Sequence, residues 1–457
     1  MTVSVSEIVV RAQNGSHRRG LILLTLCLGV LVAQVDTSVV NLAVRQIGVA
    51  FDASVASLQW VLDAYNLVYA VLLLSGGLCA DLFGRRLIFQ SGAAVIAAAS
   101  VGCVLSPDIG VLIGARVLMG VGAAMLLPAS LAIVRVVWPD ARERQRALGV
   151  WASCNGLAFV IGPTLGGLLI GHFGWQSVFL VAVPLAVAAV VLAGIVVPES
   201  ANPAGRSLDF PGQFLGAVGL GGLVFGVIAL REGGLAGVVS LAAAVIAIPL
   251  FLMVERRAGG RALVPLDLFR GGSFRGAVAA TCAMTFGIYG MIFLLPLVWQ
   301  SSGLLTARGA GLALAPCAVL FFVIAPRSGH LAQRVGTRMS TAGGTAIIGS
   351  GLVVLSLTHL GAPLPMALIG LGLTGIGMGI NTGPLMSVAV DAVGAERSGT
   401  ASSLINVARM VGATMGVAVL GAAFALGGGG VEGWRAAMLL GGGVQLCGAL
   451  MAWRTIR

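Results

Sequence analysis

Long apolar stretches recur along the chain and are separated by short polar turns. Because the hydrocarbon core of a bilayer is about 30 Å thick, a helix needs roughly 20 apolar residues to cross it, and many of the stretches reach this length. No segment shows the alternation over about ten residues that is typical of membrane-spanning strands. The pattern therefore predicts an all-α membrane protein with fourteen transmembrane helices. We expect these helices near residues 20–47, 58–80, 87–106, 109–134, 146–171, 175–197, 212–230, 234–254, 275–300, 306–326, 339–358, 363–388, 399–426 and 433–453.

The overall composition supports this interpretation. Of the 457 residues, 58% are hydrophobic and only 9% are charged. A soluble domain carries about 25% charged residues, so this chain has too few charges to cover its surface in water. Lipid is therefore the expected solvent for most of its exterior.

The distribution of positive charge predicts the orientation in the membrane. The net charge of +11 comes from arginine, since the chain contains no lysine. Most arginines fall in alternate turns, which is the positive-inside pattern rather than a nucleic-acid-binding patch. We therefore predict a multi-pass protein of the plasma (inner) membrane, with both termini in the cytoplasm and no nucleic-acid partner. The arginines on this face are Arg18, Arg19, Arg85, Arg86, Arg135, Arg142, Arg144, Arg146, Arg256, Arg257, Arg261, Arg270, Arg275, Arg327, Arg334, Arg338, Arg454 and Arg457.

The seven cysteines and four histidines do not form a recognisable site. No two cysteines form a CxxC pair, and all seven lie within or at the edges of the expected spans, where they are interpreted as small hydrophobic residues. The chain also lacks the glycine-rich phosphate-binding pattern of ATP-driven pumps. We therefore expect no metal, no cofactor and no enzymatic activity.

An internal repeat indicates how the spans are grouped. The turn at 77–86 and the turn at 329–338 match at both glycines, the alanine and the last arginine, although Gln333 replaces the carboxylate of Asp81. Two matching turns on the same face favour two six-helix halves with additional helices between them. The expected domains are a cytoplasmic tail at 1–19, an N-terminal six-helix bundle at 20–197, a linker with two extra transmembrane helices at 198–274, and a C-terminal six-helix bundle with a short tail at 275–457.

The segment at 77–86 resembles the loop signature of the major facilitator superfamily, apart from Cys79 and Leu82. Further stretches resemble the fourteen-span drug:proton antiporter branch of that superfamily, which includes actinomycete antibiotic-resistance exporters such as the methylenomycin exporter. These stretches are Asp36–Ala43, Arg116–Pro128, Gly162–Gly167, Gly174–Trp175 with Val183–Pro184, and Asn406–Gly412. The resemblance implies the major facilitator fold, with two six-helix bundles plus two inserted helices, and export driven by proton entry.

The resemblance also suggests a role for two glycine-rich motifs. The antiporter motif, formed by Gly162, Pro163, Gly166 and Gly167, is tied by the resemblance to exporters rather than importers; its proline bends a helix and its glycines allow close packing. The turn at 77–86 is interpreted as a cytoplasmic gate, with simple anchoring of the turn by its arginines as the alternative. The gate residues are Gly77, Asp81, Gly84, Arg85 and Arg86.

Charged residues inside the spans are costly in lipid and point to function. Asp36 and Arg116 are expected at similar depth, so they can pair. Burial disfavours the charged form of a carboxylate and a nearby cation favours it, so a movement of the cation changes its proton affinity. We predict that Asp36 carries the coupling proton, with a structural ion pair to Arg116 as the alternative. Asp63 is a second candidate for proton coupling, or an interfacial carboxylate near water.

Arg409 lies near the middle of the thirteenth expected span, and the spans of the second half contain no acidic residue in their interior. This asymmetry favours neutral or anionic amphiphilic substrates over dications. An apolar wall with a few polar groups suits such ligands. Candidate cavity residues are Trp151, Asn155, Met284, Phe286, Tyr289, Met378, Asn381 and Arg409.

The sequence therefore predicts a proton-driven secondary exporter of drugs or natural products that works by alternating access. The expected partners are a small amphiphilic substrate, protons and the lipid bilayer, and the chain is expected to act as a monomer. Two alternatives are a proton-coupled uptake symporter of the same superfamily and a non-transporting membrane scaffold or sensor.

Overall fold

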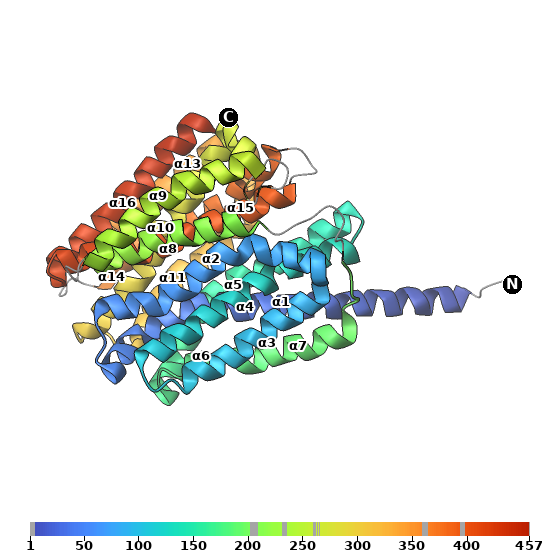
Figure 1. Cartoon of the computed structure of the whole chain (residues 1–457), viewed down its shortest axis with the longest axis horizontal. Helices are drawn as coiled ribbons and strands as arrows, with labels where there is room; N and C mark the ends of the chain where they lie inside the picture. The colour runs from blue at the N-terminus through green and yellow to red at the C-terminus, as the bar shows by residue number, and fades with distance from the viewer. Residues whose placement is uncertain are drawn as a thin grey trace.

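The computed structural model describes residues 5–201, 209–230, 235–258, 262, 264, 266–358, 364–393 and 398–456. The chain folds into long helices that run back and forth across the molecule, from side to side in Figure 1. The first seven are α1 (Val5–Phe51), α2 (Val55–Phe83), α3 (Arg85–Val104), α4 (Ile109–Val137), α5 (Ala141–Phe173), α6 (Ser177–Leu180) and α7 (Ala182–Val196). The next two are α8 (Phe210–Ala229) and α9 (Leu235–Ala258). The last are α10 (Gly272–Ser301), α11 (Ala307–Ile324), α12 (Ser328–Val335), α13 (Thr337–Ser356), α14 (Leu364–Asp391), α15 (Ser398–Leu426) and α16 (Gly430–Thr455), with 3-10 turns η3 (Leu266–Arg270) and η4 (Ala325–Arg327).

Thirteen helices in the described residues are long and apolar enough to cross a bilayer. Helix α5, which is 33 residues long, packs between α1 and α11 and completes the predicted fourteen spans. Two expected helices are divided at prolines. Pro184 cannot donate a backbone hydrogen bond to the carbonyl four residues earlier, and the sixth span is split into α6 and α7 just before it. Pro326 lies in η4, which separates α11 from α12.

The helices form two groups. Helices α1 to α7 pack on one another and are called the N-terminal group; α10 to α16 do the same and are called the C-terminal group. The groups meet mainly where α5 packs on α11, where α2 packs on α15, and where α1 packs on α10. Helix α1 begins at Val5 and continues without interruption into the first span, and the cytoplasmic location of the tail at 1–19 stays a prediction.

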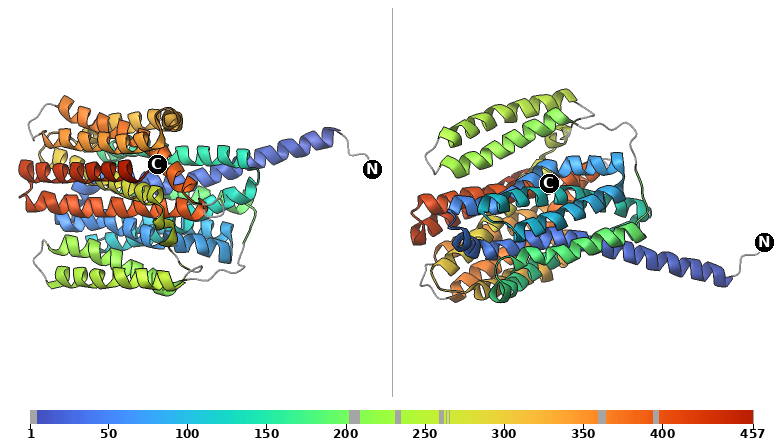
Figure 2. Two further views of the ribbon diagram at one scale, coloured as in Figure 1. Left: turned by 90° about the horizontal axis from the view of Figure 1, so that it is seen from above. Right: turned by 60° about the horizontal axis from the view of Figure 1, so that its bottom comes forward.

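Helices α8 and α9 pack against each other at the edge of the molecule (Figure 2). Helix α8 contacts α2 and α15, one helix from each group. Gln213 of α8 fixes part of this contact, because its amide nitrogen donates to the carbonyl of Val71 and its oxygen accepts from the hydroxyl of Ser75.

The two turns of the internal repeat have the same local structure. Gly84 follows α2 with φ +117° and ψ 128°, and Gly336 follows α12 with φ +89° and ψ 148°. In each turn the glycine N–H donates to the carbonyl of the alanine four residues earlier, Ala80 or Ala332. A positive φ favours glycine, so the repeated glycine is required by the backbone at both turns.

Candidate functional site

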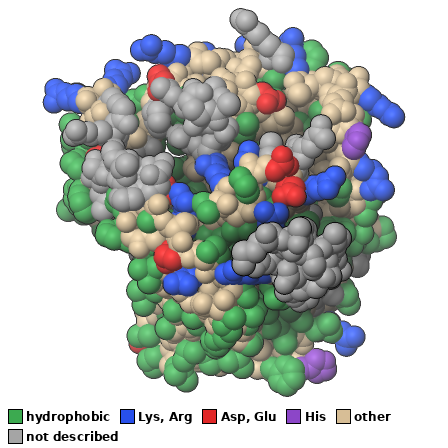
Figure 3. All heavy atoms as spheres, turned by 90° about the vertical axis from the view of Figure 1, so that its right-hand side faces the viewer, with side chains coloured by type: hydrophobic (Ala, Val, Ile, Leu, Met, Phe, Trp, Pro, Cys, Tyr) green, Lys and Arg blue, Asp and Glu red, His purple; other side chains and the backbone are tan. Residues whose placement is uncertain are grey.

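A cavity of about 1240 Å³ lies between the two groups. Its walls extend from Thr37 of α1 in the interior to the exposed side chains of Arg135, Arg146 and Asp391. The cavity therefore opens at the end of the molecule that carries most of the arginines, called here the arginine-rich end. Figure 3 looks onto this end and shows the basic side chains gathered over it.

The opposite end of the groups is closed by polar contacts between them. Gln59, near the start of α2, donates to the carbonyls of Val417 and Ala418 of α15, at 3.0 and 3.1 Å. Gln300, near the end of α10, donates to the carbonyl of Leu42 of α1 at 3.2 Å. Buried amides that bond backbone carbonyls across an interface fix one arrangement of the two groups.

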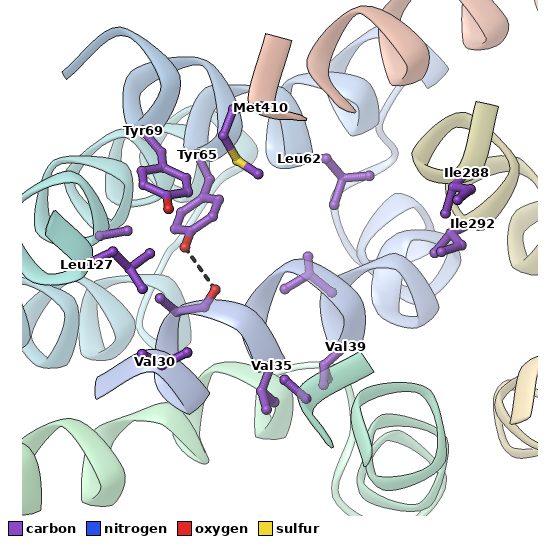
Figure 4. Close-up of a cluster of buried hydrophobic side chains, with 14 of the residues drawn as sticks. Val30, Val35, Val39, Leu62, Tyr65, Tyr69, Leu127, Ile288, Ile292 and Met410 are labelled. Atoms are coloured by element: carbon purple, nitrogen blue, oxygen red, sulfur yellow. Dashed lines mark hydrogen bonds between the residues drawn. The ribbon is translucent and has the colours of Figure 1, made fainter. Parts of the chain in front are cut away.

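An apolar cluster lies between this closed end and the cavity (Figure 4). Leu62, Tyr65 and Tyr69 of α2 belong to it, and Met410 of α15 lies beside the two tyrosine rings. Ile288 and Ile292 of α10 complete the cluster from the C-terminal group, and all six side chains are buried. The structure is therefore open at the arginine-rich end and sealed at the other.

The charged centre of the N-terminal group is an ion pair between Asp36 and Arg116. Nη1 of Arg116 donates to Oδ2 of Asp36, and each side chain is only 1% exposed. Nε of Arg116 donates to the carbonyl of Val61 at 2.8 Å, and the guanidinium lies 4.7 Å from the centroid of the Tyr65 ring. Backbone, ring and carboxylate together satisfy a cation that would otherwise be very costly to bury.

Small residues on α4 bring the arginine to α2. A Cβ atom at Gly120 would lie 2.6 Å from the carbonyl oxygen of Tyr65, which is too close for any residue other than glycine. This close approach lets Arg116, one turn earlier on α4, reach the backbone of α2. Phe179 of α6 covers the guanidinium at 5.8 Å from its ring centroid.

The ion pair is not exposed to the cavity in this conformation. Asp36 is 3% exposed and does not line the cavity, whereas its neighbours Gln34 and Thr37 do. The hydroxyl of Tyr65 donates to the carbonyl of Ala33 at 2.9 Å and holds the tyrosine against α1 (Figure 4). The carboxylate is therefore enclosed, although the next residue along α1, Thr37, lines the cavity.

Asp63, the second candidate carboxylate, has a different environment. Its side chain is fully buried, and neither oxygen has a hydrogen-bond partner among the described residues. The Oδ1 atom of Asn66, one turn along α2, is also buried and without a partner there. The two candidates are thus distinct, since Asp36 is ion-paired and Asp63 is enclosed without a counter-charge.

The predicted gate residues lie together at the arginine-rich end. Arg85 donates to Oδ1 of Asp81 from Nη2 at 2.8 Å and from Nε at 3.1 Å. Gly77 packs on Pro128 of α4, where a Cβ atom would lie 3.3 Å from the proline ring. Gly84 provides the positive φ of the turn.

Sequence reasoning missed a further member of the gate, Glu199, which follows α7. Its carboxylate accepts from the backbone N–H groups of Arg86 and Leu87, both at 3.1 Å, and pairs with the guanidinium of Arg86 at 3.6 Å. The N–H of Arg85 donates to the carbonyl of Ser200 at 2.9 Å. Glu199 therefore caps the start of α3. The sequence does contain a signal for Glu199, because it is an isolated acid on a face that is rich in arginine.

The antiporter motif lies where α5 contacts both groups. A Cβ atom at Gly166 would lie 2.9 Å from Val39 of α1, and one at Gly167 would lie 3.1 Å from the carbonyl of Ala307 of α11. Gly162 is buried, and the side chain of Pro163 lies outside the described residues. The two later glycines thus allow close contact of α5 within its own group and across the interface.

The structure divides the predicted cavity residues into two sets. Trp151, Met284, Tyr289, Met378 and Arg409 line the cavity. Phe286 and Asn381 do not, and the side chain of Asn155 lies outside the described residues. The amide of Asn381 is fully buried and donates to the hydroxyl of Thr345 at 2.7 Å, so this residue holds α14 to α13 behind the cavity wall.

Comparisons with known proteins agree with this geometry. The sequence pattern of the Major Facilitator Superfamily matches residues 26–417. The chain is 36% identical over 402 residues to the multidrug resistance protein Stp of Mycobacterium tuberculosis, a match that covers 87% of this chain and 74% of Stp. It is 32% identical over 446 residues to the methylenomycin A resistance protein of Streptomyces coelicolor, covering 96% and 92% of the two chains.

The fold is also found among solved structures. A bacterial homologue of the human lysosomal transporter Spinster, in an inward-facing and unoccupied conformation, superposes with a TM-score of 0.69. That match covers 96% of this chain and 97% of the other at 17% sequence identity, so it concerns the fold alone. The predicted fold is confirmed.

Proposed function

The chain belongs to the Major Facilitator Superfamily, and from this premise we propose that it exports drugs or natural products across the plasma membrane in exchange for protons. Relatives named as multidrug and antibiotic resistance proteins support export. The observation that carries the proposal is the buried pair of Asp36 and Arg116, which lies just beyond the inner end of a cavity that is open at one end only.

We place the arginine-rich end in the cytoplasm. Arginines in short loops remain on the cytoplasmic side of a membrane, and the turns after α2 and α12 carry Arg85, Arg86, Arg334 and Arg338. In this orientation the cavity receives substrate from the cytoplasm. The contacts of Gln59 and Gln300 then seal the outside, as alternating access requires.

Proton coupling follows from the chemistry of the ion pair. When Asp36 takes up a proton, its attraction to Arg116 falls and the buried guanidinium loses its counter-charge, which favours a rearrangement that supplies another partner. Helix α1, which carries Asp36, contacts α10 and α11 of the other group. A shift of α1 therefore reaches the interface that must open on the outside.

Asp63 has a separate role in this proposal. A buried carboxylate without a counter-charge is far more costly than a buried neutral acid. We propose that Asp63 holds a proton in this conformation and that Asp36 does not. Protonation of the two acids would then differ between the inward-open and outward-open states.

The turn at 77–86 acts as the gate in this scheme. In the inward-open structure Asp81 pairs with Arg85 of its own group, and Glu199 holds the start of α3. We propose that closing of the cytoplasmic side brings this turn against the C-terminal group, where a helix N-terminus is a favourable partner for a carboxylate.

The direction of proton movement tests the proposed function. Everted membrane vesicles with an acidic interior expose the cytoplasmic face to added compounds. An antiporter carries the compound in and protons out, so substrates dissipate the pH gradient; an uptake symporter carries both inward and adds to the acidification. We expect that added amphiphilic drugs dissipate the pH gradient only in vesicles that contain this protein. A deepening of the gradient when these compounds are added would overturn the export proposal.

A further inference from the structure

Arg409 is the charged residue that the proposed mechanism leaves unexplained. It lies eleven residues after the start of α15, near the middle of the span, and lines the cavity. Its Nε atom is buried and has no hydrogen-bond partner among the residues that the structure describes. In the part of the chain that the structure describes, no carboxylate forms an ion pair with this guanidinium.

A guanidinium keeps its charge under all ordinary conditions and has five N–H donors. Arg116 shows what such a group needs when it is buried, because a carboxylate, a carbonyl and two aromatic rings surround it. No comparable set of partners surrounds Arg409. An intramembrane cation without a partner is expensive unless a ligand or water completes its shell.

Most of the other charged side chains that line the cavity are also cations. Arg135, Arg144 and Arg146 line it toward the arginine-rich end, and Asp391 is the one carboxylate among the described residues that line it. Asp391 already accepts a hydrogen bond from the hydroxyl of Ser387 at 2.9 Å. A cavity lined by one sign of charge attracts ligands of the opposite sign.

Orientation in the membrane explains the three outer arginines but not Arg409, which lies well inside the span. Tyr69 of α2 and Tyr289 of α10 line the same cavity and supply hydroxyl groups near its inner end. The arrangement therefore combines a cation with polar donors at depth.

The remaining wall is apolar and suits the body of an amphiphile. The indole of Trp151 is held in place, because its Nε1 donates to the hydroxyl of Ser130 at 3.0 Å. The apolar residues that line the cavity include Leu127, Met284, Phe321, Phe322, Met378 and Met386.

We infer that the substrates are amphiphiles with an acidic group, and that this anion binds at Arg409 while the apolar body lies against Trp151 and the methionines. The inference rests on the proposed function, since it names the substrate class of the same cavity. Sequence reasoning left neutral and anionic substrates open; the surplus of cations on the described walls narrows the choice to anions.

The test uses binding rather than transport, so that it does not depend on proton coupling. Three fluorescent probes share a dansyl-undecyl body and end in a sulfonate, a carboxamide or a trimethylammonium group. Binding of each is measured to the full chain in lipid nanodiscs, with empty nanodiscs as background. We expect the wild type to bind the sulfonate at least about tenfold more tightly than the carboxamide, because charge-assisted hydrogen bonds are strong in a dry site.

Three variants then test whether Arg409 causes the preference for the sulfonate probe over the carboxamide probe. Arg409→Gln should remove this preference: binding of the sulfonate probe should weaken about tenfold, while binding of the carboxamide probe should change less than about twofold. Arg409→Lys should retain part of it. Arg338→Gln is the control for loss of a positive charge from the C-terminal group, because Arg338 lies at the arginine-rich end, stacks on Trp453 at 4.3 Å and does not line the cavity.

Tighter binding of the trimethylammonium probe than of the sulfonate by the wild type would overturn the inference without any variant. An unchanged sulfonate preference in Arg409→Gln would overturn the assignment of the anion to this residue. Proton antiport can fail in vesicles while the sulfonate preference holds, so the two proposals are tested separately.

Discussion

Arg116 of α4 and Arg409 of α15 each lie inside a transmembrane helix, one in the N-terminal group and one in the C-terminal group. Arg116 is paired with Asp36, bonded to the carbonyl of Val61 and covered by aromatic rings. Arg409 lines the cavity, and its buried Nε has no hydrogen-bond partner in the described part of the chain. The protein thus supplies a counter-charge to the arginine of one group, and among the described residues it supplies none to the arginine of the other.

The repeated turns differ in the same way. Gly84 and Gly336 share one backbone conformation, but a Cβ atom at Gly84 would meet the carboxylate of Glu199 at 2.9 Å. One at Gly336 would meet no atom of the described residues within 4 Å. Asp81 pairs with Arg85 in the first turn, and Gln333 stands at the matching position of the second. The N-terminal group therefore carries the charge pairs that protonation or rearrangement can break, and the C-terminal group carries a cation that a ligand can satisfy.

The largest expected difference is in stability after removal of each arginine. Arg116→Met leaves Asp36 buried without its partner, so the unfolding free energy should fall by about 3 kcal/mol or more. Arg409→Met leaves no described carboxylate behind and should change it by less than about 1 kcal/mol. Denaturant unfolding of the purified protein in detergent measures both.

Because Asp36 loses its partner in Arg116→Met, the unfolding free energy of this variant should depend on pH. Arg116→Met should regain stability relative to wild type as the pH falls, because the buried carboxylate of Asp36 becomes neutral when it takes up a proton. The double variant Arg116→Met/Asp36→Asn should recover most of the loss at all pH values. Equal destabilisation by Arg116→Met and Arg409→Met would remove the contrast between the groups.

A smaller difference is expected between the two turns. Alanine at Gly84 or Gly336 is strained by the positive φ, at about 1–3 kcal/mol each. Only Gly84→Ala also displaces the carboxylate of Glu199, so it should be the more destabilising of the two and should reduce transport more. Thermal unfolding and transport of both variants check this order, and a larger effect at Gly336 would contradict it.

The smallest expected effect belongs to Glu199 itself. Glu199→Ala removes the cap of α3 and should lower the unfolding free energy by about 1 kcal/mol. The control is Glu432→Ala, whose pair with Arg435 is highly exposed and should contribute less than about 0.5 kcal/mol. Indistinguishable losses at the two sites would mean that Glu199 is an ordinary surface carboxylate.

Much of the fold could be predicted because a lipid bilayer restricts the length and the polarity of each membrane-spanning helix. Each span needs a long apolar run, and the repeated turn revealed the grouping. The pairing of Asp36 with Arg116 was accessible as well, since helix rise places both at similar depth. The division of the chain at Val181 and at Ala325–Arg327 was not predicted, although prolines lie close to both positions.

The remainder depends on the rotation and register of packed helices, which hydrophobic pattern does not encode. Asn381 was expected in the cavity, yet it faces Thr345 of a neighbouring helix. Gln59 and Gln300 were not noticed, because a lone glutamine near the end of a span has no distinctive spacing. The enclosure of Asp36 behind the cavity wall could likewise be seen only once the helices were placed.

The central claim is that Asp36 exchanges the proton that drives transport. Asp36→Asn protein in proteoliposomes separates coupling from binding, because exchange of labelled for unlabelled substrate needs no net proton movement. We predict that this exchange is kept within about twofold of wild type, while substrate accumulation driven by an imposed pH gradient is lost. Accumulation at the wild-type level in Asp36→Asn would contradict the account.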